Sequence, residues 1–159
     1  GSDTLLMAYV HVAHDCVIGN HVILANASNL AGHITIDDWA IIGGMAAVHQ
    51  FVHIGTHCMI SGGSLVRKDV PPYSKAAREP LSYVGVNSIG LRRRGFTSEQ
   101  ITNIQEIYRT IYLRGYNVSQ ATEIIEADMP ATPERDEILT FISNSSRGIM
   151  KGYSKLKEK

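Results

Sequence analysis

The sequence has few cysteines, no surplus of either charge and no long apolar run. Lys and Arg together number 15, as do Asp and Glu, so the formal net charge is zero. This balance argues against a general nucleic-acid or membrane-surface binder. No apolar run approaches the roughly 18 residues of a membrane-spanning helix. Cys16 and Cys58 are isolated from one another, and both fall where a core is expected. We interpret them as buried thiols in a reducing compartment.

What the sequence does contain is a six-residue repeat. Every sixth position from Leu6 to Val66 holds a branched aliphatic side chain, and its neighbours are mostly small or apolar. A period of six fits neither a helix nor an alternating strand, and it is typical of the hexapeptide repeats of a parallel β-helix. The sequence therefore predicts a left-handed parallel β-helix over residues 1–70. The aliphatic positions are Leu6, Val12, Ile18, Leu24, Leu30, Ile36, Ile42, Val48, Ile54, Ile60 and Val66.

Three repeats complete one coil of such a solenoid. Residues about 18 apart then lie above one another, and successive coils are about 4.8 Å apart. Residues 5–70 would form between three and four coils. The six-residue repeat is already present at the first residues of the chain. A solenoid of so few coils leaves unpaired strand edges at both ends. We therefore expect the chain to be the C-terminal portion of a longer solenoid.

The repeat stops at Pro71-Pro72, because proline cannot sustain a sheet ladder. We expect residues 71–96 to be an irregular linker and residues 97–159 to form a helical domain. The linker contains Arg92-Arg93-Arg94 near Asn87. Guanidinium groups bind phosphates with two-point geometry, so this cluster indicates an anion site.

The helical domain has recognisable helix starts. Thr97 and Gln100 have the spacing of a capping box, and Pro133 follows Thr132 as a first-turn proline. Helices are expected from Thr97 to about Arg114, from Ser119 to about Ala127, and from Thr132 to about Asn144. The last stretch, residues 145–159, ends in Lys-rich sequence and is expected to be frayed.

Seven histidines are concentrated in the repeat. The coil predicts three columns of residues: His14 with Gly32 and Gln50, Asp15 with His33 and Phe51, and Ala13 with Ala31 and His49. Four histidines, His11, His14, His33 and His49, would gather at one edge of the prism. A single histidine there would be an ordinary surface residue, but clustered titratable groups indicate an active site.

Three interpretations of this edge are open. The histidines could bind zinc and activate water, an arrangement that resembles the γ-type carbonic anhydrases, although zinc leaves the arginine cluster unexplained. Alternatively, a neutral His14 is the general base of an acyl transfer, and the N–H of Gly32, one coil away, holds the oxyanion. Asp15 could orient an imidazole, but neighbours in a strand face opposite sides, so its partner could be another group. The third interpretation is a scaffold that only binds.

Several motifs together resemble one family, the acyl-(acyl-carrier-protein)–UDP-N-acetylglucosamine O-acyltransferases, which catalyse the first step of lipid A synthesis. The resemblance covers nearly the whole chain, including the helical part, and the pairing of AVHQF with RRGF distinguishes it from the sister N-acyltransferases. The matching runs are residues 11–20 (HVAHDCVIGN), 30–33 (LAGH), 41–51 (IIGGMAAVHQF), 69–73 (DVPPY) and 85–96 (GVNSIGLRRRGF).

The resemblance implies a role for each matching position. It implies that His14 deprotonates the sugar 3-hydroxyl, that Asp15 is its partner and that the Gly32 N–H holds the oxyanion. It implies contacts to the sugar and the acyl donor from His11, His33 and His49, to the diphosphate from Gln50, and to the nucleotide and phosphates from Asn87, Arg93 and Arg94. Gly62 resembles the position that limits the length of the acyl chain.

The resemblance also implies partners and assembly. The acyl donor is a 3-hydroxyacyl group on the phosphopantetheine of acyl carrier protein, and the acceptor is UDP-N-acetylglucosamine. Neither a metal nor a bound cofactor is expected, and no nucleic-acid partner. Members of the family are cytoplasmic homotrimers with active sites between subunits. They carry further solenoid coils upstream, which hold additional sugar and nucleotide contacts.

Overall fold

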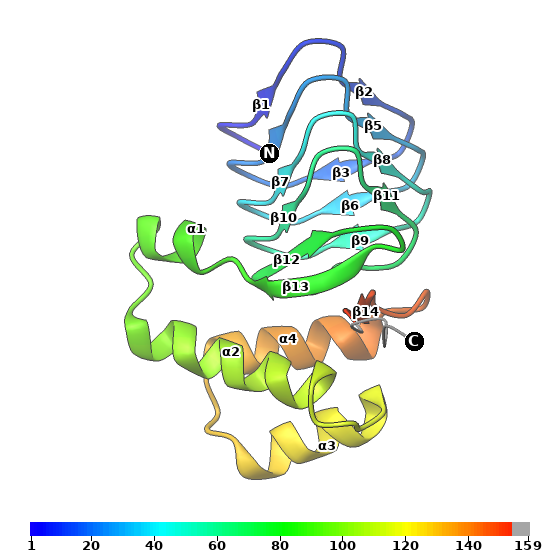
Figure 1. Ribbon diagram of the computed structural model, residues 1–159. Helices are drawn as coiled ribbons and strands as arrows, with labels where there is room; N and C mark the ends of the chain where they lie inside the picture. Colours follow the sequence, from blue (N-terminus) through cyan, green and yellow to red (C-terminus); the bar gives the residue numbers. More distant parts are fainter. Residues whose placement is uncertain (154–159) are drawn as a thin grey trace, which may run out of the picture.

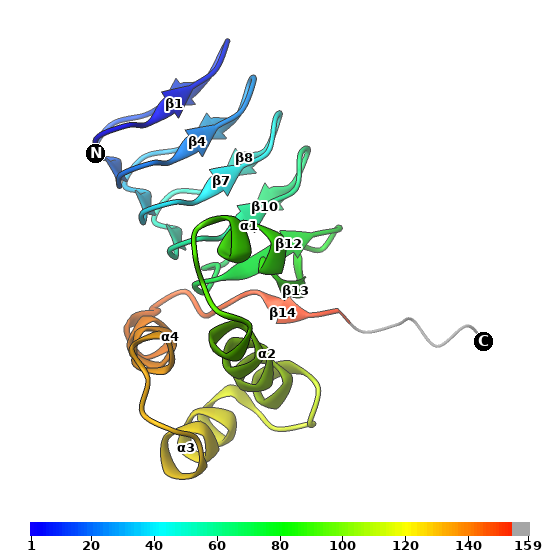
Figure 2. The same ribbon diagram turned by 90° about the vertical axis from the view of Figure 1, so that its left-hand side faces the viewer.

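The computed structural model describes residues 1–153, which form a three-sided prism of stacked coils with a helical domain at one end (Figure 1, Figure 2). Two-residue strands alternate with turns, and each side of the prism is a parallel sheet. The sheets have the strand orders β1-β4-β7-β10, β2-β5-β8-β11 and β3-β6-β9, the first being extended by later strands. The parallel solenoid predicted from the repeat is confirmed. Its strands are β1 (Leu5–Leu6), β2 (His11–Val12), β3 (Val17–Ile18), β4 (Ile23–Leu24), β5 (Asn29–Leu30), β6 (Thr35–Ile36), β7 (Ile41–Ile42), β8 (Ala47–Val48), β9 (His53–Ile54), β10 (Met59–Ile60) and β11 (Leu65–Val66).

The register confirms the predicted columns. Leu6 lies opposite Leu24, Leu24 opposite Ile42, and Ile42 opposite Ile60, so the coil contains 18 residues. The aliphatic position of each repeat points inward, and Leu24, Ile42 and Ile60 are 0% exposed. Burying one such side chain stabilises the fold by about 1.5–3 kcal/mol. The apolar positions of the repeat therefore fix which residues lie along each outer edge.

Each corner of the prism as far as Gly63 has one residue in the left-handed conformation. In one column φ is +57° at Asp15, +58° at His33 and +65° at Phe51. This conformation costs a non-glycine residue of order 1 kcal/mol, and hydrogen bonds between coils offset it. The His33 N–H donates to the His14 carbonyl at 3.0 Å, and the Phe51 N–H donates to the Gly32 carbonyl at 3.2 Å. The corners are therefore repeated, well-defined positions for outward-facing side chains.

The expectation that residues 71–96 form an irregular linker is wrong. This segment contains β12 (Ser74–Ala77), β13 (Ser82–Val86) and the short helix α1 (Ser88–Arg93). After Pro71-Pro72 the chain pairs again with the solenoid, β12 lying parallel to β10, and then turns back as the antiparallel strand β13. Pro71-Pro72 ends the repeat but not the sheet, because the paired residues that follow lie beyond the prolines.

The helical domain consists of α2 (Ser98–Tyr112), α3 (Val118–Asp128) and α4 (Pro133–Asn144). The capping box predicted at Thr97 is present, and Thr132 caps α4 with proline in its first turn. A second capping box at Asn117 begins α3 one residue earlier than predicted. These three helices share a core with the end of the solenoid, to which Tyr73 and Val86 also belong.

The stretch after α4 is ordered as far as the structure describes it, which corrects the expectation that residues 145–159 are frayed. The chain returns to the solenoid, where β14 (Lys151–Gly152) pairs in parallel with β13. Met150, 1% exposed, packs in the solenoid core, which anchors this return. Residues 154–159 lie outside the described part of the chain.

Cys16 and Cys58 are both unbonded to another cysteine. Cys58 is buried as predicted, and burial raises the pKa of its thiol to about 12. Cys16 is only half-buried, since no coil covers it from above, and its Sγ donates to the Ala31 carbonyl at 3.1 Å. Among residues 1–153, no helix combines the length and apolarity needed to cross a membrane.

Candidate functional site

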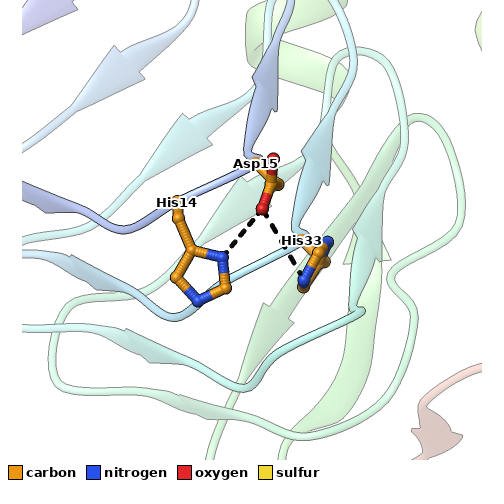
Figure 3. A group of neighbouring side chains, drawn as sticks. All are labelled: His14, Asp15 and His33. Carbon is orange, nitrogen blue, oxygen red and sulfur yellow. Dashed lines mark hydrogen bonds and ion pairs between the residues drawn. The ribbon is translucent and has the colours of Figure 1, made fainter.

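His14, Asp15 and His33 come together at the corner between the β2-β5-β8-β11 side and the β3-β6-β9 side, which we call the His14 edge (Figure 3). His14 and Asp15 occupy the turn between β2 and β3, and His33 occupies the same turn one coil later. The Nδ1 of His14 lies 2.9 Å from Oδ2 of Asp15, and the Nε2 of His33 lies 3.8 Å from the same oxygen. One carboxylate therefore faces two imidazoles.

The left-handed conformation of Asp15 explains why it reaches its own neighbour. The two residues lie in a turn rather than in a strand, so the alternation that separates neighbouring side chains does not apply. The hydrogen bond from His14 and then the charge of His33 hold the pKa of Asp15 below its usual range. The carboxylate is therefore ionised at neutral pH. As an acceptor it fixes the His14 proton on Nδ1 and leaves Nε2 as the basic nitrogen.

Gly32 packs directly against the His14 ring. A Cβ at this position would lie 2.7 Å from Cε1 and 2.8 Å from Nε2 of His14, closer than atoms can approach. A side chain here would therefore displace the imidazole. Within the described part of the chain, the Gly32 N–H donates to no backbone carbonyl. The Gly32 backbone thus lies beside the His14 ring, as the column predicted.

The His33 ring is held by its neighbours. It stacks on Phe51, with ring centroids 4.9 Å apart and planes inclined by 10°, and it meets His14 edge-on at 5.0 Å. Phe51 belongs to the same column, one coil further on. Stacking on one side and an edge contact on the other fix the plane of the ring.

His11, His49 and Gln50 lie on or beside the same edge and are exposed. The Nδ1 of His49 lies 3.3 Å from Nη2 of Arg147 and 3.1 Å from the Gln50 carbonyl oxygen. A guanidinium only donates and a carbonyl oxygen only accepts, so these two contacts belong to opposite tautomers of the His49 ring. No motif or spacing in the sequence predicted a role for Arg147, which lies 98 residues further along the chain than His49.

Asn87, Arg93 and Arg94 do not join this cluster. They lie around α1, beside the corner between β9 and β10, which we call the His57 edge (Figure 1). Asn87 is 4% exposed, caps α1 and donates Nδ2–H to the His57 carbonyl at 3.0 Å. Arg94 lies over the Trp39 ring at 5.2 Å. Arg93 is exposed.

A stack of flat rings follows the His57 edge and was not predicted. His21 stacks on Trp39 at 4.0 Å, and His57 follows Trp39 at 6.1 Å, each one coil apart. The Nη1 of Arg94 donates to Nδ1 of His57 at 3.1 Å. Burial and then the charge of Arg94 lower the pKa of His57 to about 4, against an opposing effect of Asp38. His57 is therefore neutral at physiological pH. The 18-residue spacing of these rings in the sequence could have predicted the stack.

The group His14, Asp15 and His33 has the residue types of a metal site. One ligand atom from each lies within 4.8 Å of the others. Tetrahedral zinc with bonds of about 2.0–2.1 Å separates its ligands by roughly 3.4 Å. The distances of 2.9 and 3.8 Å around Asp15 instead describe a hydrogen-bonded pair with a more distant second ring. The geometry favours a base with its orienting carboxylate.

Gly62 lies away from these side chains, on the corner that follows β10. It is exposed, and a Cβ there would meet the Gly44 carbonyl oxygen at 3.0 Å. Gly44 occupies the same position one coil earlier. Gly44 and Gly62 leave these two positions without side chains, while Met45 beside them is exposed.

The fold and the edge define a hexapeptide-repeat transferase, and residues 1–32 match the model for bacterial transferase hexapeptides (six repeats). Residues 69–150 match the model for UDP N-acetylglucosamine O-acyltransferase, domain 2, and the chain belongs to this family.

Individual relatives agree with this assignment. The acyl-(acyl-carrier-protein)–UDP-N-acetylglucosamine O-acyltransferase of Janthinobacterium sp. (strain Marseille) is 43% identical over 155 residues, which are 95% of this chain and 59% of that protein. A UDP-N-acetylglucosamine acyltransferase structure from Bacteroides fragilis 9343 superposes with a TM-score of 0.92 at 52% identity, covering 93% of this chain and 58% of that one. The Francisella novicida enzyme superposes at 0.91 with 39% identity, covering 95% and 55%. The chain thus spans somewhat more than half the length of the relatives it matches.

Proposed function

We propose that the protein containing this chain transfers a 3-hydroxyacyl group from acyl carrier protein to the 3-hydroxyl of UDP-N-acetylglucosamine, the first step of lipid A synthesis. The names of its relatives supply the substrates. The observation that carries the chemistry is the His14–Asp15 pair at 2.9 Å with Gly32 packed against the ring. It combines a base, its orienting carboxylate and a backbone donor.

In this mechanism the Nε2 of His14 accepts the proton of the sugar hydroxyl while that oxygen attacks the thioester carbonyl carbon. The negative charge that develops on the carbonyl oxygen is stabilised by the Gly32 N–H. The imidazolium is stabilised by Asp15. The intermediate then collapses, the C–S bond breaks, and the leaving thiolate takes the proton from Nε2. The donor brings its own phosphopantetheine, so the proposal requires no bound cofactor and no metal.

The substrate contacts extend this proposal. His11, His33, His49 and Gln50 lie along the His14 edge, where they would contact the sugar, the acyl donor and the diphosphate. Asn87, Arg93 and Arg94 are on the His57 edge, a different corner of the same prism. Their separation supports a homotrimer in which the arginines of one subunit face His14 of the next. Gly62 would limit the length of the acyl chain.

Replacing His14 with alanine tests the proposal. We expect the His14→Ala protein to lose acyl transfer, measured as acylated sugar nucleotide by mass spectrometry, while its circular dichroism and oligomeric state are unchanged. His53→Ala is the control, because His53 also pairs with an aspartate, Asp37 at 2.7 Å, but lies in β9 and not on the His14 or His57 edge, and it should retain transfer. Transfer at the unaltered rate by His14→Ala would refute the mechanism.

The zinc hydratase is not favoured, because the chain belongs to the O-acyltransferase family and the distances around Asp15 do not match a zinc site. Metal analysis of the purified protein separates the two, since stoichiometric zinc together with CO₂ hydration would favour the hydratase. A scaffold without chemistry is the remaining alternative, and it predicts that the unmodified protein transfers no acyl group to any acceptor.

A further inference from the structure

The columns of the His14 edge continue past the candidate site into basic residues. Val66 lies opposite Val48, which places Arg67 one coil beyond His49, and Lys68 comes next in the chain. The 18-residue register ends here, since Val70 pairs with Ile54. Both basic side chains are exposed. Three coils separate Val12, beside the candidate site, from Val66, which corresponds to about 14 Å along the edge.

A third basic residue joins them from the far end of the chain. The Nη2 of Arg147 donates to the Arg67 carbonyl at 3.2 Å and lies 3.3 Å from Nδ1 of His49. The Nζ of Lys68 donates to the Arg147 carbonyl at 2.7 Å. We call Arg67, Lys68 and Arg147 the basic platform. Through His49 it is continuous with the candidate site.

Asp69 holds the platform in place. It is 3% exposed, and its Oδ2 accepts from the Ser145 hydroxyl at 2.5 Å. Its backbone N–H donates to the Gly148 carbonyl at 3.1 Å, and its carbonyl accepts from the Met150 N–H at 2.9 Å. Arg147 lies between these contacts, so its backbone is fixed against the last coil. The platform is therefore preorganised, which reduces the entropy cost of binding a partner.

The platform carries a surplus of positive charge. In the described part of the chain Glu79 is the one carboxylate paired with these three side chains, at 2.9 Å from Arg67, and this pair is more than half exposed on both sides. At the surface, three positive charges against the one exposed carboxylate leave a surplus of two, and the Asp69 carboxylate beneath them is buried. The chain as a whole is neutral, so this surplus is a local feature and not part of a general basic character.

We propose that the basic platform binds carboxylates on the surface of acyl carrier protein and so directs the thioester along the edge toward His14. This inference rests on the proposed function. The guanidinium and ammonium groups already donate to carbonyl or carboxylate oxygens of the chain. They present spread positive charge rather than converging donors, which suits a protein face with several carboxylates better than a single phosphate.

The test measures the affinity for acyl carrier protein directly. We expect the Arg67→Glu/Lys68→Glu double variant to raise the dissociation constant for the carrier by about tenfold or more and to flatten its dependence on salt. The KM for the carrier should rise in parallel, and the KM for the sugar nucleotide should not change. Arg67→Lys, which keeps the charge, should bind the carrier like the unmodified protein.

Arg109 provides a matched control. Its side chain is 57% exposed and lies 2.8 Å from Glu106, compared with 56% exposed and 2.9 Å from Glu79 for Arg67. Arg109→Glu on α2 should leave carrier binding unchanged. An unchanged dissociation constant in the folded double variant overturns the docking proposal, as does an equal loss in Arg109→Glu. Binding is measured without turnover, so these outcomes do not depend on whether the unmodified protein transfers acyl groups. The proposed function itself is tested separately, by the acyl-transfer assay.

Discussion

At the scale of single residues, the environment of His57 makes the stability of the folded protein depend on pH. Its pKa is lowered to about 4, from a usual value of 6.5, chiefly by burial and then by Arg94. Between these values the unfolded chain binds this proton and the folded protein does not. The contribution of His57 is therefore complete above pH 6.5, and it is progressively lost as the pH falls toward 4.

We expect His57→Gln to reduce the pH dependence of the free energy of unfolding between pH 6.5 and 4. Glutamine keeps an acceptor for Arg94 but does not titrate. Urea unfolding of both proteins at several pH values above and below 6.5 measures the difference. His11→Gln is the control, since His11 is exposed. The same pH dependence of the free energy of unfolding in His57→Gln and in the unmodified protein would contradict the proposed role of His57.

The sequence predicted much of the residue-level arrangement of the His14 edge. The 18-residue column placed Gly32 beside His14, and these residues are in contact in the structure. The column and the strand alternation did not predict the bond between His14 and Asp15, which only the family resemblance implied, because the bond depends on the left-handed conformation at Asp15. Nor did the sequence predict that Arg94 would be held by His57, since this contact forms between the solenoid and a helix of unknown placement.

At the scale of elements, Glu137 fastens α4 to the solenoid. Its carboxylate accepts from the Thr56 hydroxyl at 2.5 Å and from the hydroxyl of Tyr73. Tyr73 is 4% exposed, and burial followed by the bond to Glu137 raises the pKa of its phenol well above the usual range. Removing the carboxylate would leave a buried hydroxyl without its acceptor.

We expect Glu137→Ala to lower the free energy of unfolding by about 2–3 kcal/mol, because hydrogen bonds to a charged group are lost in a partly buried site. Chemical denaturation followed by circular dichroism measures the loss. Glu126→Ala on α3 is the matched control, since this residue is exposed, and it should change stability by less than about 0.5 kcal/mol. Equal stabilities of the two variants would show that Glu137 does not fasten α4.

Helices were more predictable than the segment before them. Thr97 and Thr132 mark helix starts by local chemistry, and both cap helices in the structure. The strands of residues 74–86 form by pairing with β10, a partner distant in sequence. Their sequence shows neither the six-residue repeat nor strong alternation, so no local signal distinguished them from a loop.

At the scale of the whole molecule, the proposed trimer can be tested by mixing subunits. His14→Ala and Arg93→Ala subunits are each expected to be deficient, the first in the base and the second in a nucleotide contact. If sites form between subunits, random mixed trimers regain about a quarter of their sites with both residues intact. Transfer assays on co-expressed subunits, compared with each variant alone, measure this recovery. No recovery in verified mixed trimers would place both residues in one subunit's site.

The return of the chain after α4 also has a consequence for the order of folding. A solenoid can add coils one after another as they are synthesised, because each coil contacts only its neighbours. Here the sheet begun by β1 is completed by β14, which joins only after all three helices of residues 98–144 have been made. Contacts of such long sequence separation form slowly. During synthesis on a ribosome the coils nearest the N-terminus would therefore form first. The pairing of β14 and the placement of Arg147 would follow only after the segment beyond α4 has been made.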